Sequence, residues 1–153
     1  MKIYIILHNI RSSYNVGAIF RTADAAQVDK IYLTGYTPTP KTNPKQIHKS
    51  ALGAENFVQW EKHKNINYLL KKLKKEKFKI VAVEQSEKSI PYYKFKPKND
   101  LVLIFGNEVR GLNKKILEKA DYILEIPMLG KKESLNVAIS CGIIVYYLRF
   151  RDY

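Results

Sequence analysis

The stretch Leu101-Val-Leu-Ile-Phe105-Gly106-Asn-Glu108-Val-Arg-Gly111-Leu112 combines an apolar run with a polar turn between two glycines. Residues 101–105 are all apolar, which is typical of a strand buried on both faces, as in a parallel sheet. A glycine directly after the strand permits a tight turn or the close approach of a ligand to the backbone. The glycine spacing is that of a P-loop, but Leu112-Asn113 replaces the required Lys-Ser or Lys-Thr, so a nucleoside triphosphatase is unsupported.

Further apolar runs alternate with segments of helical period along the rest of the chain. The runs predict strands at residues 3–7, 31–34, 57–60, 79–83, 101–105 and 122–126. The helical period predicts crossover helices at 16–27 and 66–73, and a terminal helix at 134–150 that is apolar on all sides. The proline-containing segments 35–49 and 85–99 are expected to be surface loops. The pattern indicates an α/β fold with a mostly parallel sheet flanked by helices.

Length and composition indicate one domain over residues 1–153, because 46% of the residues are hydrophobic and no repeat or linker interrupts the chain. The one cysteine, Cys141, cannot form an internal disulfide and lies in the apolar terminal segment. We therefore expect an inert, buried thiol and a cytoplasmic protein. No apolar run approaches the roughly 18 residues that a membrane span needs, so we expect a soluble protein without a membrane partner.

The charge of the chain points to a polyanionic partner. Lys and Arg number 27 against 14 Asp and Glu, which gives a formal net charge of +13. RNA, DNA or an anionic membrane would each suit this charge. The alternative is a compositional bias, since 22 of the cations are lysines and only five are arginines.

Two common kinds of site are excluded. His8, His48 and His63 have no cysteine or carboxylate at ligand spacing, so we expect no metal site. The G-x-G-x-x-G pattern of dinucleotide-binding proteins is absent.

Three polar clusters remain, each at a strand end or helix start, where α/β proteins bind ligands. In the first, a helix start near Asn15 and the guanidinium of Arg21 could meet a phosphate or carboxylate, or Asn15 could cap the helix while Arg21 stays solvated. The second is the turn at residues 106–112. In the third, Ser134 is expected to cap the terminal helix, with Asn136 in its first turn.

In this order, the three clusters resemble the signature motifs of the SpoU (TrmH-like) family of RNA 2′-O-ribose methyltransferases, within the SPOUT superfamily. The residues that carry the resemblance are Asn15-Val-Gly-Ala-Ile-Phe-Arg21-Thr-Ala-Asp24, Phe105-Gly-Asn-Glu108-Val-Arg-Gly111-Leu112 and Ile126-Pro-Met-Leu-Gly-Lys-Lys-Glu-Ser134-Leu-Asn136-Val137. The stretch from His48 to Glu55 also resembles one that precedes the third strand in this family. The resemblance implies a C-terminal trefoil knot, which is a rare exception to un-knotted topology.

The resemblance also implies a cofactor and a reaction. S-adenosyl-L-methionine would be held by three loops whose residues here are Val83, Glu84, Gly106, Ile126, Met128, Ser134 and Leu135. The implied catalytic residues are Arg21, Asn15, Glu108, Ser134 and Asn136. Because a guanidinium stays protonated at neutral pH, we expect Arg21 to stabilise charge on the ribose oxygen and not to act as the base.

The implied partners are RNA, with tRNA favoured over rRNA, and a second copy of the chain that packs on the terminal helix. Surface lysines such as Lys41 are candidates for contacts with RNA phosphates. Two alternatives stay open. The chain could methylate a base nitrogen, as other SPOUT enzymes do, or it could be a catalytically inactive RNA-binding module.

Overall fold

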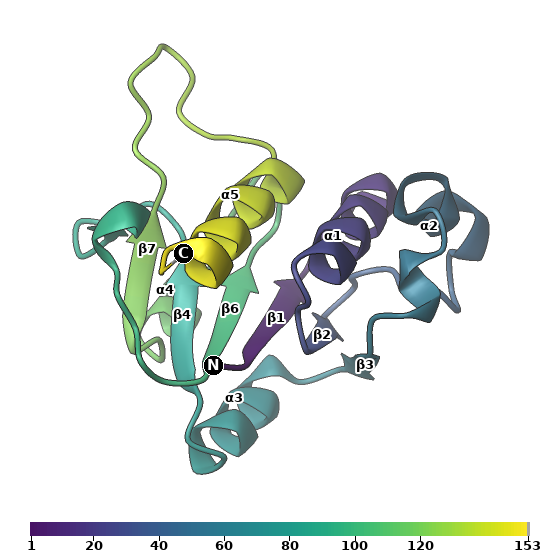
Figure 1. Ribbon diagram of the computed structural model, residues 1–153, viewed down its shortest axis with the longest axis horizontal. Helices are drawn as coiled ribbons and strands as arrows, with labels where there is room; N and C mark the ends of the chain where they lie inside the picture. Colours follow the sequence, from purple (N-terminus) through teal and green to yellow (C-terminus); the bar gives the residue numbers. More distant parts are fainter. Residues whose placement is uncertain (153) are drawn as a thin grey trace.

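Seven strands form one parallel sheet in the computed structural model, which describes residues 1–152 (Figure 1). The order of the strands across the sheet is β3-β2-β1-β6-β4-β7-β5, and every neighbouring pair is parallel. The strands are β1 (Ile3–His8), β2 (Lys30–Thr34), β3 (Trp60–His63), β4 (Lys79–Val83), β5 (Ile90–Pro91), β6 (Leu101–Phe105) and β7 (Tyr122–Glu125). The expected α/β fold with a parallel sheet is confirmed.

Helices cover both faces of the sheet. They are α1 (Ser13–Ala25), α2 (Pro44–Ala51), α3 (Ile66–Lys75), α4 (Lys114–Leu117) and α5 (Val137–Phe150), with short 3₁₀ turns at Ala54–Asn56 and Tyr92–Lys94. The buried side chains of α1, α2 and α5 pack into one hydrophobic cluster, and those of α3 and α4 pack into another. Alternate residues of β1 and β6 point into the two clusters, so each cluster lies on its own face of the sheet.

The central strands are buried from both sides. All five residues of β6 are buried, as the unbroken apolar run predicts. On α5, Cys141 and Leu148 are buried, whereas Ile139, Tyr146 and Phe150 are exposed. Burial raises the pKa of the Cys141 thiol well above its usual value, which agrees with an inert side chain. Within residues 1–152, no helix is long and apolar enough to cross a membrane.

Three predicted boundaries are wrong. The strand expected at 57–60 begins only at Trp60, and Phe57 is 77% exposed. The segment expected to be the loop 35–49 contains most of α2, which begins at Pro44. The loop expected at 85–99 contains the two-residue strand β5.

The helix caps also differ from the prediction. Ser134 does not cap α5; the cap is Asn136, whose side-chain oxygen accepts hydrogen bonds from the backbone N–H groups of Ala138 (2.8 Å) and Ile139 (3.3 Å). Helix α1 begins before Asn15, because the hydroxyl of Ser12 accepts from the Asn15 N–H at 3.2 Å. The trefoil knot that the resemblance implies stays a prediction.

Candidate functional site

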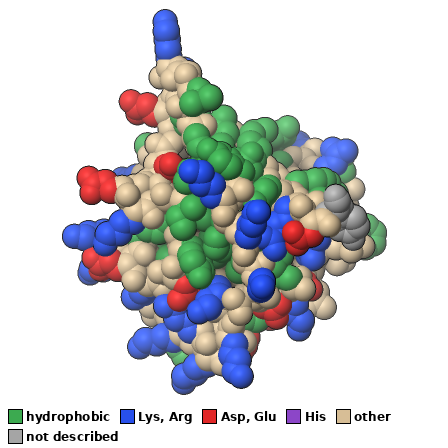
Figure 2. Space-filling view, turned by 60° about the vertical axis from the view of Figure 1, so that its left-hand side comes forward, with side chains coloured by type: hydrophobic (Ala, Val, Ile, Leu, Met, Phe, Trp, Pro, Cys, Tyr) green, Lys and Arg blue, Asp and Glu red, His purple; other side chains and the backbone are tan. Residues whose placement is uncertain are grey.

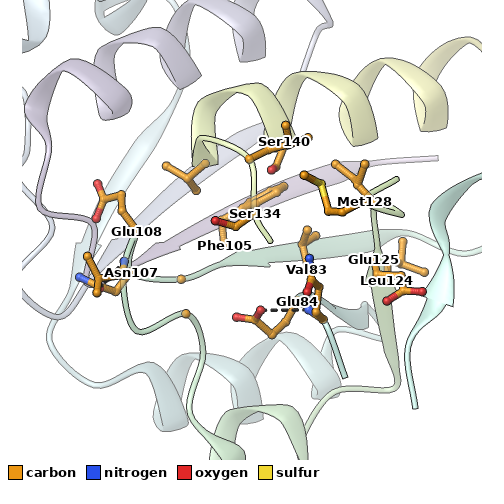
Figure 3. A pocket seen from close by; sticks show the side chains of 17 residues that line it. Val83, Glu84, Phe105, Asn107, Glu108, Leu124, Glu125, Met128, Ser134 and Ser140 are labelled. Atoms are coloured by element: carbon orange, nitrogen blue, oxygen red, sulfur yellow. Dashed lines mark hydrogen bonds between the residues drawn. The ribbon is translucent and has the colours of Figure 1, made fainter. Parts of the chain in front are cut away.

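A pocket lies at the carboxyl ends of β4, β6 and β7, next to the point where the strand order changes direction between β1 and β6 (Figure 3). Ligands of open parallel sheets bind at such positions. Figure 3 shows Asn107 and Glu108 at one end of the pocket, and Leu124 and Glu125 at the other. The loop between β7 and α5 and the first turns of α5 form the remaining wall.

All seven residues expected to bind the cofactor line this one pocket. They come from three segments far apart in sequence, and they are Val83, Glu84, Gly106, Ile126, Met128, Ser134 and Leu135. Of the expected catalytic residues, Glu108 and Ser134 also line it. The structure brings these side chains together; their binding of a cofactor stays a prediction.

The pocket is acidic although the chain is strongly basic. Three glutamates, Glu84, Glu108 and Glu125, line it, and no Lys or Arg is among its lining residues. By contrast, Lys and Arg side chains are spread over the molecular face in Figure 2, most densely in its lower part. The pocket therefore favours a ligand that carries positive charge.

The turn after β6 depends on its glycines. The N–H of Gly111 donates to the carbonyl of Asn107 at 2.9 Å, which closes the turn. A Cβ atom on Gly106 would lie 2.6 Å from the Gly111 carbonyl carbon, closer than real Cβ contacts come. The tight turn therefore accounts for a glycine at position 106 whether or not a ligand binds there.

Glu84 links this turn to the end of β4 through hydrogen bonds. Its carboxylate accepts hydrogen bonds from the backbone N–H groups of Gln85 and Leu112, both at 2.9 Å. Gly111 has a φ of 64°, which favours glycine, and a Cβ atom there would lie 2.1 Å from a Glu84 oxygen and so displace this carboxylate. The contacts of Glu84 within the described residues are therefore structural.

Glu108, Asn15 and Asn136 form one hydrogen-bonded chain. The Glu108 carboxylate accepts from the N–H groups of Arg11 (3.0 Å) and Ser12 (3.1 Å) and from Asn15 Nδ2 (3.2 Å). Asn136 Nδ2 in turn donates to Asn15 Oδ1 at 3.0 Å. These hydrogen bonds join the turn after β6 to the starts of α1 and α5. The three residues therefore fix the positions of the pocket walls relative to one another.

The pKa of Glu108 reflects this environment. Burial raises it, but the hydrogen bonds from Arg11, Ser12 and Asn15 outweigh burial, and the pKa lies below its ordinary value. The carboxylate is therefore ionised at neutral pH and retains these hydrogen bonds.

Arg21 does not reach the pocket of its own chain. It is exposed and lines a separate shallow hollow with Tyr14, Lys49 and Tyr146. Arg21 follows Asn15 by six residues on α1, which places the two side chains about 120° apart around the helix axis. Asn15 faces the pocket wall, and Arg21 faces away from it.

Sequence reasoning missed Asn107, which also lines the pocket. Its Oδ1 accepts from the N–H groups of Val109 (2.9 Å) and Arg110 (2.8 Å), and its Nδ2 donates to the Asn9 carbonyl (3.0 Å) and to the hydroxyl of Tyr36 (2.9 Å). The available signal was an asparagine directly after Gly106, since asparagine commonly hydrogen-bonds the backbone two residues on. No group of His, Cys, Asp and Glu suited to a metal ion occurs in residues 1–152.

Comparison with known proteins gives a consistent result. Residues 2–146 match the SpoU rRNA Methylase family. The chain is 34% identical over 142 residues to the tRNA (guanosine(18)-2′-O)-methyltransferase of Aquifex aeolicus, a match that covers 93% of this chain and 66% of the relative. It is 32% identical over 145 residues to the 23S rRNA (guanosine(2553)-2′-O)-methyltransferase of Bacillus subtilis, with 95% and 57% covered.

A solved structure agrees with these matches. The AdoMet-bound rRNA methyltransferase from Sinorhizobium meliloti has a TM-score of 0.88 at 27% identity, with 98% of this chain and 56% of that chain covered. The chain thus spans less than two thirds of the length of each of these proteins.

Proposed function

Because the chain belongs to the SpoU rRNA Methylase family, we propose that it transfers a methyl group from S-adenosylmethionine to a ribose 2′-hydroxyl of RNA. The Aquifex and Bacillus relatives are named as 2′-O-methyltransferases, one acting on tRNA and the other on 23S rRNA. The observation that carries the proposal is the pocket, where three distant segments meet at the carboxyl edge of the sheet and contribute three glutamates but no cation.

The pocket suits S-adenosylmethionine chemically. This cofactor joins a purine nucleoside to a positively charged sulfonium, which supplies the methyl group. Ile126, Met128 and Leu135 offer apolar surface for the purine. Glu84 and Glu108 supply negative charge near a bound cation. Seven lining residues agree with those that the resemblance assigns to the cofactor.

The protein residues contribute mainly by positioning. Methyl transfer requires the ribose oxygen, the methyl carbon and the sulfur to lie in line, and a fixed site supplies that alignment. The Glu108–Asn15–Asn136 chain keeps the pocket walls at fixed separation. We assign Ser134, whose side chain faces the pocket, to the acceptor side of the site. Water or a substrate phosphate takes the hydroxyl proton, since a guanidinium group does not act as a base at neutral pH.

In this proposal, Arg21 of one protomer completes the active site of a second copy of the chain. Its side chain is exposed beside Tyr14 and Tyr146, which are 67% and 44% exposed. Elsewhere on α5, Ile139 and Phe150 are also exposed. Exposed apolar side chains on one terminal helix favour an isologous dimer. In such a dimer Arg21 would stabilise the developing negative charge at the pocket of the partner chain.

The substrate in this proposal is RNA, with tRNA favoured over rRNA, and the reaction takes place in the cytoplasm. The net charge of +13 supports a polyanionic substrate. The pocket is acidic, whereas the rest of the protein is basic. This distribution of charge is expected when a cationic cofactor and a polyanion bind side by side.

Calorimetry with S-adenosylhomocysteine, followed by mapping of 2′-O-methyl groups, tests the proposal. The purified protein is incubated with S-adenosylmethionine and bulk RNA from cells that lack the gene. We expect binding of S-adenosylhomocysteine and one mapped ribose. RNA with a single 2′-deoxy nucleotide at that position should then accept no methyl group. Methylation of the deoxy RNA would favour base-nitrogen methylation, and a folded protein that binds no S-adenosylhomocysteine would favour the inactive module.

A further inference from the structure

A second hollow lies beside the pocket, on the β1 side of the point where the strand order changes. Its floor is the segment 36–43 that follows β2, and its sides include Arg11, which follows β1, and Lys62 of β3. The pocket occupies the ends of β6, β4 and β7, and this hollow occupies the neighbouring ends of β1 and β2. A polymer that reaches the pocket along this edge of the sheet therefore passes over the hollow.

Two adjacent pocket residues hold the border between the hollow and the pocket. Asn107 Nδ2 donates to the Tyr36 hydroxyl at 2.9 Å, which fixes the outer end of the tyrosine ring. The Glu108 carboxylate accepts from the Arg11 N–H at 3.0 Å, which fixes the backbone beneath the arginine side chain. Tyr36 and Arg11 are thus positioned by the same turn that forms one end of the pocket.

The floor of the hollow is rigid, because its two prolines restrict the backbone and hydrogen bonds hold it in place. Thr37 is 2% exposed, and its hydroxyl lies 2.8 Å from the carbonyls of Leu7 and Thr34 and accepts from the Ile10 N–H at 3.0 Å. Lys62 Nζ donates to the carbonyls of Gly35 (2.6 Å) and Thr37 (2.8 Å). A segment fixed in this way loses little entropy when a ligand binds.

The side chains that face this hollow include two cations without hydrogen-bonding or ion-pair partners in residues 1–152, and one exposed aromatic ring. Arg11 and Lys41 are exposed, and neither side chain makes a hydrogen bond or ion pair within residues 1–152. The Tyr36 side chain is 58% exposed. The one carboxylate among the lining residues, Glu61, is neutralised by Lys30 Nζ at 2.6 Å and contacts His63 Nε2 at 3.0 Å.

Cationic side chains with an exposed ring suit a nucleotide. Guanidinium and ammonium groups bind phosphates, and splayed RNA bases stack on aromatic rings. We propose that this hollow binds an RNA nucleotide next to the methylated ribose, with a phosphate between Arg11 and Lys41 and a base stacked on Tyr36. The inference rests on the proposed function, because it takes RNA as the substrate of the neighbouring pocket.

The first test removes the two charges. The double variant Arg11→Gln/Lys41→Gln is compared with the wild type for binding to bulk tRNA from cells that lack the gene, at several NaCl concentrations. We expect at least about tenfold weaker binding at low salt. The slope of log K against log salt should fall by roughly 0.7 to 0.9 for each lost phosphate contact. Affinity for S-adenosylhomocysteine should not change.

The matched control removes the same charge elsewhere. Lys114 and Lys115 begin α4, which packs on the other face of the sheet. We expect Lys114→Gln/Lys115→Gln to reduce tRNA affinity less than threefold. Equal losses in both double variants would overturn the inference, because net charge alone would then explain the binding.

The second test concerns the ring. We expect Tyr36→Leu to weaken tRNA binding about tenfold, since stacking of one base contributes on that scale, and Tyr36→Phe to restore most of the affinity. Wild-type affinity in both Tyr36→Leu and the Arg11/Lys41 variant, with RNA methylation intact, would refute the inference alone. If the wild type methylates no RNA but its tRNA affinity depends on Arg11 and Lys41, the proposed methyltransferase activity would be refuted. The proposal that the hollow binds RNA would still hold.

Discussion

Replacement of Glu108 by glutamine tests how the pocket is held together. The carboxylate accepts three hydrogen bonds, from the N–H groups of Arg11 and Ser12 and from Asn15 Nδ2. In Glu108→Gln one oxygen becomes an NH₂ donor, which loses one bond to the charged group and weakens the other two. A hydrogen bond to a charged group contributes about 1.5–3 kcal/mol, and partial exposure reduces this value. We expect the free energy of unfolding to fall by about 1–2 kcal/mol at pH 7.

The effect of the substitution should depend on pH. The pKa of Glu108 in the folded protein lies below its ordinary value of 4.5. A lowered pKa means that the ionised carboxylate stabilises the fold above pH 4.5 and that this stabilisation is lost as the pH falls through the folded pKa. The difference in stability between the wild type and Glu108→Gln should therefore be largest at neutral pH and shrink below pH 4.5.

Urea denaturation followed by circular dichroism measures this difference at a fixed protein concentration, because an oligomer unfolds at a concentration-dependent midpoint. Glu118→Gln is the matched control. The Glu118 side chain is 63% exposed, and within the described part of the chain it makes only a 4.0 Å ion pair with Lys114, so its loss should change stability by less than about 0.5 kcal/mol. Equal urea midpoints for wild type and Glu108→Gln at pH 7, or a difference that grows as the pH falls, would refute the reasoning.

Three further substitutions test the packing, the catalytic proposal and the dimer. Gly17→Ala should lower the free energy of unfolding by about 1–3 kcal/mol, because the new Cβ would lie 2.2 Å from Ser50 Oγ. Gly142→Ala, whose Cβ would lie 4.0 Å from its neighbour, should not destabilise, and equal losses would contradict the packing argument. Arg21→Ala should slow methyl transfer roughly 10²-fold without changing cofactor affinity, and Arg21→Lys should also be impaired; a fully active Arg21→Ala protein would exclude this role. We expect the wild type to sediment as a dimer and Tyr146→Asp as a monomer at micromolar concentration, whereas identical sedimentation would contradict a dimer interface at Tyr146.

The strands of the central sheet could be predicted because strands that are buried on both faces consist of unbroken runs of apolar residues. Residues 101–105 are apolar without interruption, and β6 is buried at every position. The same reasoning fails at Phe57, which is apolar but 77% exposed, because a short apolar run does not reveal which residues meet the core. Pro44 suggests a loop, yet it stands at the first position of α2, where no helical hydrogen bond needs its missing N–H.

The candidate site could be predicted only in part. The resemblance identifies seven cofactor residues that line the pocket, and the rule that ligands bind at carboxyl ends of parallel strands gives their place. Sequence alone does not fix which side of α1 faces the pocket, so Asn15 and Arg21 were expected in one site although they point apart. Ser134 and Asn136 are both good capping residues, and only the hydrogen bonds from the Ala138 and Ile139 N–H groups to Asn136 Oδ1 show which of them caps α5.

The order of the strands has a consequence for synthesis of the chain on the ribosome. Strand β1 pairs with β2, which follows soon after it, but its other neighbour is β6, and Ile3 pairs with Leu101. At about 5–20 residues per second, one edge of β1 waits roughly 5 to 20 seconds for its partner to be made. During that interval the emerging β1–β2 unit presents an unpaired apolar edge, the kind of surface on which nascent chains aggregate. Chaperone demand should therefore be greatest while residues 35–100 are being translated, before β6 is available to close the centre of the sheet.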